Sequence, residues 1–175
     1  MSYPVVIINY DSRWPLIYEE EKRRILDVGS HKILSLEHIG STSVVGLGAK
    51  PIIDIMAGVN WLSDANGLLP VLRAIGYKNS VRQSGDPDWY YCLSKIIYGK
   101  EAWLQNLHLH LMKFKSQTWK RHILFRDFLR NHSEVAQKYN KLKRMLAAKY
   151  GNDRESYTNA KTKFIASVST QSKEK

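Results

Sequence analysis

The feature that most constrains the fold is the stretch HIGSTSVVGLGAKPIIDI, residues 38–55. Its first part holds three glycines and three small hydroxyl residues, a composition that favours a loop. Its second part is β-branched and apolar, as in a buried strand, yet it contains the carboxylate of Asp54. A charged group there must be paired, lie at the strand end or bind a metal. The stretch therefore predicts either a phosphate-binding loop followed by a metal ligand or a flexible connection into a strand with a structural ion pair.

Strand-like and helix-like segments alternate around this junction. Apolar alternation predicts strands at 5–10, 32–40, 51–59, 90–98 and 102–114, the last two forming a hairpin with its bend at 99–101. Helical spacing predicts helices over 13–28, 63–75, 117–131, 134–149 and 153–168. We expect four of them to be capped, by Ser12, Ser63, Ser133 and Asp153. The order predicts an α+β protein with a mixed sheet and a helical C-terminal third.

The length and composition bound the organisation of the chain. The 175 residues are most simply one domain, 1–175, with a mixed α/β part at 1–114 and a basic helical part at 115–170. We expect no membrane partner, because no window approaches the roughly 18 apolar residues of a membrane helix. The N-terminus lacks the features of a secretory signal, so we expect a cytoplasmic protein. A single cysteine, Cys92, excludes an internal disulfide, and its strand-like segment indicates a packed thiol.

Positive charge is concentrated in the last third of the sequence. Residues 1–114 carry 12 Lys and Arg against 11 Asp and Glu, whereas residues 115–175 carry 15 against 5. This second part therefore accounts for +10 of the net charge of +11. Such an excess indicates either an anionic partner or a solubilising helical surface.

Two histidines alternate with leucines in LHLHL, residues 107–111. On a strand His108 and His110 share one face, and the leucines share the other. Paired imidazoles suit a transition metal, a phosphate group or proton transfer. Surface or hydrogen-bonded histidines are the simpler interpretation of the pair taken alone.

Basic residues recur on the C-terminal helices. His122, Arg126 and Arg130 form an i, i+4, i+8 stripe next to Arg121. Lys161 lies within the apolar stripe of the last helix, so it must extend to the surface, pair with an acid or reach a cleft. For each residue a structural ion pair competes with a ligand contact.

Four segments span most of the chain: VVIINYDSRWPLIYEEEK, LEHIGSTSVVGLGAKPIIDI, NLHLHLMKFKSQTWKRHILFRDFLRNH and DRESYTNAKTKFI. Together they resemble the GrpB-like family of the nucleotidyltransferase (polymerase-β-like) superfamily. The resemblance implies a mixed, largely antiparallel nucleotidyltransferase-type sheet flanked by helices. Some members of the family are fused to a dephospho-CoA kinase, which implies a nucleotide or coenzyme A-related ligand.

The superfamily pattern is Gly followed by Gly or Ser, a spacer, an acid, an apolar residue and a second acid. By this resemblance the Gly40-Ser41 turn and Thr42 contact phosphate, and Asp54 is the catalytic ligand of Mg²⁺ or Mn²⁺. The pattern departs at Met56, where the second acid is replaced by a thioether, a poor Mg²⁺ ligand. With His108 and His110, Asp54 suits Zn²⁺ or Mn²⁺ better, provided that the three side chains converge near Ser41.

Three functions follow from these observations. The first is nucleotidyl transfer dependent on a divalent metal; the second is binding of a nucleotide or phosphorylated small molecule without catalysis; the third is nucleic-acid binding by the basic helices. The candidate phosphate-binding residues are Gly40, Ser41, Thr42, Ser43, Lys50, Arg121, Arg126 and Lys161. The candidate metal ligands are Asp54, His108, His110 and Glu37. The missing second acid leaves open whether the protein is an enzyme.

Overall fold

The computed structural model describes residues 4–82, 88–98 and 104–171. The elements in chain order are α1 (Trp14–Gly29), β1 (Ser35–Ile39), the 3-10 turn η1 (Ser41–Ser43), β2 (Ile52–Val59), α2 (Leu62–Ala74), β3 (Lys78–Arg82), β4 (Trp89–Tyr98), β5 (Leu104–Lys113), α3 (Gln117–Asn131), α4 (Ser133–Tyr150) and α5 (Arg154–Gln171). The predicted hairpin bend at 99–101 lies outside the described residues. The antiparallel pairing of β4 with β5 agrees with that hairpin.

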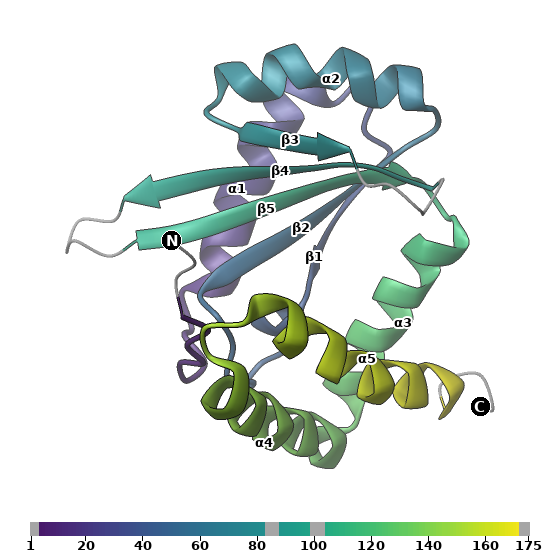
Figure 1. The fold of residues 1–175 in the computed structure, drawn as a ribbon. Coiled ribbons are helices and arrows are strands. Elements are labelled where there is room, and N and C mark those ends of the chain that lie inside the picture. Colours follow the sequence, from purple (N-terminus) through teal and green to yellow (C-terminus); the bar gives the residue numbers. More distant parts are fainter. Residues whose placement is uncertain (1–3, 83–87, 99–103, 172–175) are drawn as a thin grey trace.

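The strands form one five-stranded sheet in the order β1-β2-β5-β4-β3 (Figure 1). Only the central pair, β2 and β5, is parallel, and the other three pairs are antiparallel. The predicted mixed, largely antiparallel sheet is therefore confirmed. The parallel pair places two segments that are far apart in sequence side by side at the middle of the sheet.

One face of the sheet is buried against α1 and α2. The alternation of β5 puts Leu107, Leu109 and Leu111 on this face, where all three are fully buried. Ile53 and Ile55 of β2 join the same core. Asp54, His108 and His110 therefore point to the opposite face, as the alternation of the two strands requires.

The opposite face carries the helical third of the chain (Figure 1). Trp119 of α3 packs with Met56 and Met112 of the sheet. Helices α4 and α5 pack together, with the rings of Tyr139 and Phe164 stacked at a centroid distance of 5.0 Å. All five predicted helices are present, each with bounds within three residues of the prediction.

The predicted set of strands needs two corrections: one predicted strand is absent from the described residues, and one observed strand was not predicted. Residues 5–10 form no strand; they pair with the glycine-rich loop at a single bridge between Ile8 and Ala49. Val6 and Ile8 of this run are exposed, and the run does not extend the sheet. Strand β3 was not predicted, because its sequence KNSVR lacks clear alternation, and it is stabilised by pairing with β4.

Three of the four predicted caps are wrong. Arg13 precedes α1 without a side-chain cap, so Ser12 has no capping role. At α2 the side chain of Asp64 accepts a hydrogen bond from the backbone N–H of Trp61, which replaces a cap by Ser63. Ser133 is the first residue of α4. The cap by Asp153 is confirmed: its carboxylate accepts a hydrogen bond of 3.0 Å from the Ser156 N–H.

None of the helices in the described ranges is both long enough and apolar enough to span a bilayer.

Candidate functional site

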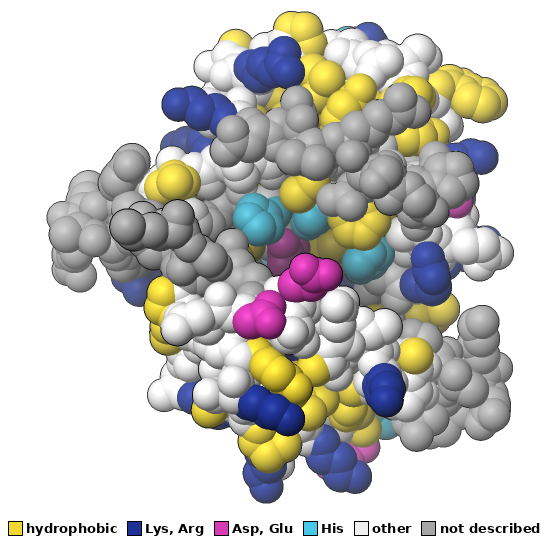
Figure 2. Space-filling view, in the orientation of Figure 1, with side chains coloured by type: hydrophobic (Ala, Val, Ile, Leu, Met, Phe, Trp, Pro, Cys, Tyr) yellow, Lys and Arg dark blue, Asp and Glu magenta, His cyan; other side chains and the backbone are white. Residues whose placement is uncertain are grey.

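The parallel pairing of β2 with β5 assembles the centre of the site. It sets Asp54 directly opposite His108, and Met56 opposite His110. The Oδ1 atom of Asp54 lies 3.3 Å from Nε2 of His110 and 3.4 Å from Nδ1 of His108. These three predicted site residues therefore converge on one carboxylate oxygen. Figure 2 shows histidine and acidic side chains together in a hollow on this face of the molecule.

The glycine-rich loop begins at Gly40 with a backbone conformation suited to glycine, at φ 71°. A Cβ atom at this position would lie 2.6 Å from Oδ2 of Asp54, so the loop passes closely over the carboxylate. The Thr42 hydroxyl donates a hydrogen bond to the Ile52 carbonyl and lies 3.1 Å from Nε2 of His38. The Ser43 hydroxyl donates to the Gly40 carbonyl at 2.6 Å. These contacts fix the loop as a 3-10 turn above Asp54.

A cavity of about 180 Å³ opens between this loop, the sheet and the C-terminal helices. It is lined by Gly40, Ser41, Thr42, Ala49, Lys50, Ile52, Asp54, His108, Tyr139, Lys143, Tyr157 and Lys161. Six of the predicted phosphate or metal residues line it together with the predicted Asp54: Gly40, Ser41, Thr42, Lys50, His108 and Lys161. The loop, the acid and the last helix, which are distant in sequence, thus share one concave surface.

Three lysines meet in this cavity. The Nζ atom of Lys143, which is buried, donates hydrogen bonds to the Ser41 hydroxyl, at 2.9 Å, and to the Gly48 carbonyl. Lys50 and Lys161 both lie over the ring of Tyr157, at 5.5 Å and 4.5 Å from its centroid. Such a cluster of cations attracts an anion.

The pKa values of two of these lysines are lowered, because the amines are buried close to other positive charges. Burial, together with the charges of Lys161, Arg144 and Lys50, lowers the pKa of Lys143 to about 7. Burial, with the charge of Lys50, lowers the pKa of Lys161 to about 8. A bound anion would supply the negative charge that this group of amines lacks.

The carboxylate of Asp54 and its neighbouring histidines attract each other, in contrast to the lysines, which repel one another. Burial raises the pKa of Asp54, but the hydrogen-bonding contacts from His108 and His110 outweigh it and hold the pKa well below its usual range. Burial lowers the pKa of His110, but the Asp54 carboxylate and the Cys92 thiol raise it more, to about 9. Asp54 is therefore an ionised, partly exposed carboxylate at the floor of the cavity.

The predicted ligand His110 contacts Asp54 but does not itself line this cavity, and four other predicted residues do not line it either. Arg126 forms an ion pair of 2.7 Å with Glu37 and another of 2.8 Å with Asp127. Both Glu37 and Arg126 are thus engaged in a structural pair that ties α3 to β1. Arg121 donates a hydrogen bond to the Thr118 hydroxyl within its own helix.

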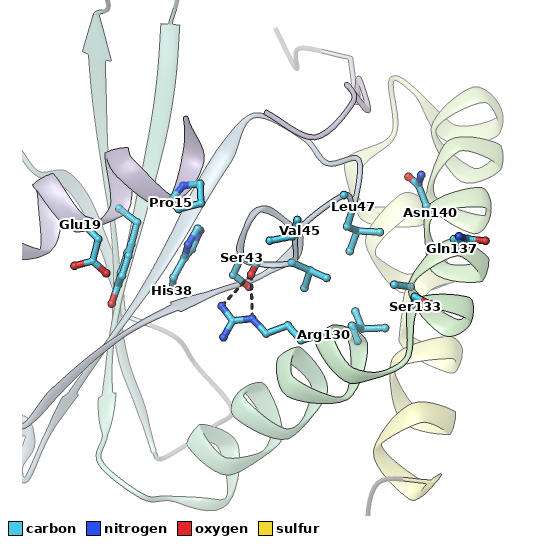
Figure 3. Close-up of a pocket in the computed structure, with 15 residues that line it drawn as sticks. Pro15, Glu19, His38, Ser43, Val45, Leu47, Arg130, Ser133, Gln137 and Asn140 are labelled. Atoms are coloured by element: carbon cyan, nitrogen blue, oxygen red, sulfur yellow. Dashed lines mark hydrogen bonds between the residues drawn. The ribbon is translucent and has the colours of Figure 1, made fainter. Parts of the chain in front are cut away.

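Ser43, the fourth of these residues, lines a second cavity of about 520 Å³ on the other side of the loop (Figure 3). There the guanidinium of Arg130 donates two hydrogen bonds, of 3.1 Å and 2.9 Å, to the Ser43 carbonyl. Figure 3 shows these bonds joining α3 to the loop. Arg130, which belongs to the predicted basic stripe, thus holds the loop on the side of the second cavity.

The donor set does not fit the Mg²⁺ ion that the fold implies. Met56 stands where a second carboxylate is expected, and it is fully buried among Ile39, Met112 and Trp119. The carboxylate of Glu37 is engaged by Arg126. The donors next to Asp54 are imidazoles, whereas Mg²⁺ requires oxygen ligands in near-octahedral geometry.

Two parts of the site were missed from the sequence. Lys143 lies seven residues after Ala136 and four after Tyr139, both buried, so its position in the apolar stripe of α4 was a detectable signal. Cys92 pairs with His110 across β4 and β5, and the sulfur and an imidazole nitrogen of each histidine, His108 and His110, all lie within 4.8 Å of one another. That proximity depends on strand register, which the sequence alone does not give.

Known proteins are similar to this chain in sequence and in fold. The family model described as GrpB protein matches residues 4–171. The glutamate-rich protein GrpB of Alkalihalophilus pseudofirmus is 32% identical over 94% of this chain and 93% of its own length. The crystal structure of conserved protein GrpB from Enterococcus faecalis has a TM-score of 0.81 and 28% identity, covering 95% of this chain and 96% of that one.

A structure of the Cid1 poly(U) polymerase with Mg 3'-dATP bound has a TM-score of 0.54 and 12% identity, over 88% of this chain and 49% of that chain. At this identity the likeness concerns the fold alone, which this chain shares with that polymerase. The family model matches residues 4–171, and the relative from Alkalihalophilus pseudofirmus aligns over nearly the full length of both chains. These two matches identify the family of the sequence. The chain belongs to the GrpB family.

Proposed function

We propose that this protein binds a nucleotide or another phosphorylated small molecule, with its phosphate groups in the cavity lined by Ser41, Lys143 and Lys161. One observation carries the proposal: the Gly40-Ser41 turn, three lysines and the carboxylate of Asp54 line the same cavity. The lysines are Lys50, Lys143 and Lys161. Small hydroxyls and ammonium groups are suitable partners of phosphate oxygens. The fold supports the same conclusion by analogy, because the Cid1 structure that shares it holds a nucleotide.

The size of the cavity indicates which part of the ligand it takes. Its volume of about 180 Å³ is roughly six times the ~30 Å³ that a water molecule occupies in the liquid. Phosphate groups fit this space, and a nucleoside or pantetheine portion would extend outside it. The choice among nucleotides, coenzyme A precursors and related compounds then depends on surfaces beyond the cavity.

Nucleotidyl transfer is the second candidate function, and the ionised Asp54 beside the phosphate site favours it. Transfer of a phosphoryl group depends on positioning and on neutralising charge at the phosphate oxygens. The three lysines could supply part of that charge. The poor fit of the donor set to Mg²⁺ is the reason to place binding before catalysis.

Thermal shift with a ligand panel tests the binding proposal. The panel consists of the four ribonucleoside triphosphates, coenzyme A, dephospho-coenzyme A and inorganic triphosphate, each with a chelator and then with Mg²⁺, Mn²⁺ or Zn²⁺. A ligand present at 100 times its dissociation constant stabilises the folded state by about 2.7 kcal/mol. We expect at least one phosphorylated ligand to raise the melting temperature. If none does so at any metal condition, the proposal is wrong.

A matched pair of lysines on α5 locates the site. Lys161→Gln removes a cation that lines the cavity, whereas Lys163→Gln removes an exposed one on the same helix. A lost hydrogen bond to a charged group costs about 1.5–3 kcal/mol, so we expect the affinity of Lys161→Gln to fall roughly 10- to 100-fold. Calorimetry should find Lys163→Gln unchanged. Equal losses in both variants would place the ligand elsewhere.

Asp54→Asn separates binding from transfer. If the protein transfers a nucleoside monophosphate, release of pyrophosphate should stop in this variant while the ligand still stabilises the fold. Pyrophosphate release that survives Asp54→Asn would contradict a catalytic role for this carboxylate.

A further inference from the structure

The clustered donors on the sheet include a thiol. Cys92 of β4 lies directly opposite His110 of β5, and Asp54 of β2 lies directly opposite His108. One candidate ligand atom from each of Cys92, His108 and His110 lies within 4.8 Å of the other two. Three adjacent strands thus bring sulfur, imidazole nitrogen and carboxylate oxygen together on one face.

The two nitrogens of His110 have different surroundings. Nε2 faces Oδ1 of Asp54 at 3.3 Å. Nδ1 is buried and makes no hydrogen bond to any part of the chain that the structure describes. A buried polar atom without a partner is costly, so it calls for an explanation. An imidazole with one nitrogen on a carboxylate and the other directed away is the arrangement of a metal-binding histidine.

We propose that Cys92, His108 and His110 bind a zinc ion, with Asp54 accepting a hydrogen bond from the ring of His110 and fixing its orientation. A thiolate with two imidazoles is a donor set that zinc favours, and Mg²⁺ does not. The Cys92 thiol loses its proton to solvent when the sulfur binds the metal. Three protein ligands leave the fourth position of a tetrahedral ion open, as in catalytic zinc sites.

The open position has a defined neighbour, and this step rests on the proposed function. His108 and Asp54 also line the cavity that we assign to phosphate, so the ion lies beside the phosphate groups of the ligand. A cation there would add to the charge of the three lysines. Asp54 then serves as a positioning residue of the metal site, in contrast to the direct ligand that the superfamily pattern implies.

Cobalt is the probe that tests the sulfur ligand. Cys92 is the only cysteine of the chain, so any sulfur-to-cobalt charge-transfer absorption must come from it. The full-length protein is stripped with a chelator and titrated with Co²⁺, and Zn²⁺ is then added as competitor. We expect the charge-transfer band to appear at one equivalent, to vanish when Zn²⁺ displaces Co²⁺ and to be absent in Cys92→Ser.

Three variants distinguish a built site from chance binding. His110→Asn should abolish the band, and Asp54→Asn should retain it with an affinity about 10- to 100-fold weaker, the range measured for partners of metal-binding histidines. His31→Asn, at an exposed histidine, is the matched control and should leave the titration unchanged. Circular dichroism of each variant verifies folding.

A cobalt complex without the sulfur band, or a band that persists in His110→Asn, would overturn the zinc proposal. Nucleotide binding is measured in parallel on the wild type and Cys92→Ser in the presence of chelator. If the metal site fails, nucleotide binding should still be observed in both proteins. If nucleotide binding fails, the cobalt spectrum still reports on the metal site.

Discussion

At the scale of single residues, Met56 decides how far the likeness to nucleotidyltransferases extends. Its side chain is fully buried against Met112 and Trp119, so it belongs to the packing of α3 on the sheet. A carboxylate in this apolar contact would carry a large desolvation cost. Helix α3 therefore occupies the side of the sheet where a second acid would need water or metal.

Lys143 is a buried cation whose charge weakens the fold. Its pKa of about 7 in the folded protein lies well below the roughly 10.4 of a lysine in an unfolded chain. Between these values the unfolded state binds a proton that the folded state does not. Stability therefore rises with pH in this window, by up to about 1.4 kcal/mol per pH unit from this group alone, and the slope ends below about pH 7.

Replacing the lysine should remove its part of this dependence. We predict that the unfolding free energy of Lys143→Met rises less steeply between pH 7 and 10 than that of the wild type, with the contribution of Lys161 remaining, whereas Lys141→Met, at an exposed lysine of the same helix, keeps the full rise. Urea unfolding at a series of pH values measures both. Parallel curves for the wild type and Lys143→Met would show that this amine keeps an ordinary pKa in the folded protein.

At the scale of elements, the loop between β1 and β2 is held from both sides. Arg130 of α3 binds the Ser43 carbonyl from one cavity, and Lys143 of α4 binds the Ser41 hydroxyl from the other. The Gly40 end rests on Asp54. The loop thus depends on two helices and one strand, and its rigidity is a property of the assembled fold.

Two glycines of this loop provide a matched comparison. Gly40 and Gly46 both have positive φ, at 71° and 77°, so alanine is strained at either, by about 1–3 kcal/mol. A Cβ atom at Gly40 would also collide with Asp54, whereas at Gly46 it meets no heavy atom within 4 Å. We predict that Gly40→Ala lowers stability more and weakens ligand binding, and that Gly46→Ala shows only the strain. Denaturant unfolding and calorimetry measure these effects, and equal losses of affinity would contradict the collision.

The sequence predicted the elements of the site better than their contacts. The strands at 51–59 and 102–114 and the faces of Asp54, His108 and His110 followed from alternation, because side-chain direction in a strand is a local property. The pairing of Asp54 with His108 depends on the register of two strands about fifty residues apart. The same limit hid the pairing of Cys92 with His110. The ion pair of Arg126 with Glu37 depends instead on how α3 packs against β1, which is also a tertiary property. The caps at α1 and α2 failed because other local contacts are formed there: the Asp11 carboxylate accepts hydrogen bonds from Arg13, and the Asp64 carboxylate accepts one from the Trp61 N–H.

At the scale of the whole molecule, the excess positive charge divides into two populations. Lys143 and Lys161 lie in the cavity, with Lys50 from the loop. Other lysines of the C-terminal helices, such as Lys138, Lys141 and Lys163, are exposed. Exposed charges bind polyanions through counterion release, which is steeply salt-dependent, whereas a buried cluster recognises a small anion locally.

This division predicts separable binding of RNA and nucleotide. We expect single-stranded RNA to bind weakly, with log K falling linearly against log salt concentration, and the triple change of Lys138, Lys141 and Lys163 to Gln to reduce that slope by about two. The same variant should bind the nucleotide with unchanged affinity, because none of the three lysines lines the cavity. Fluorescence anisotropy with RNA and calorimetry with nucleotide, each over a salt series, measure the two activities. Loss of nucleotide binding in the triple variant, or displacement of nucleotide by RNA at high salt, would mean that the basic helices and the cavity form one continuous nucleic-acid site.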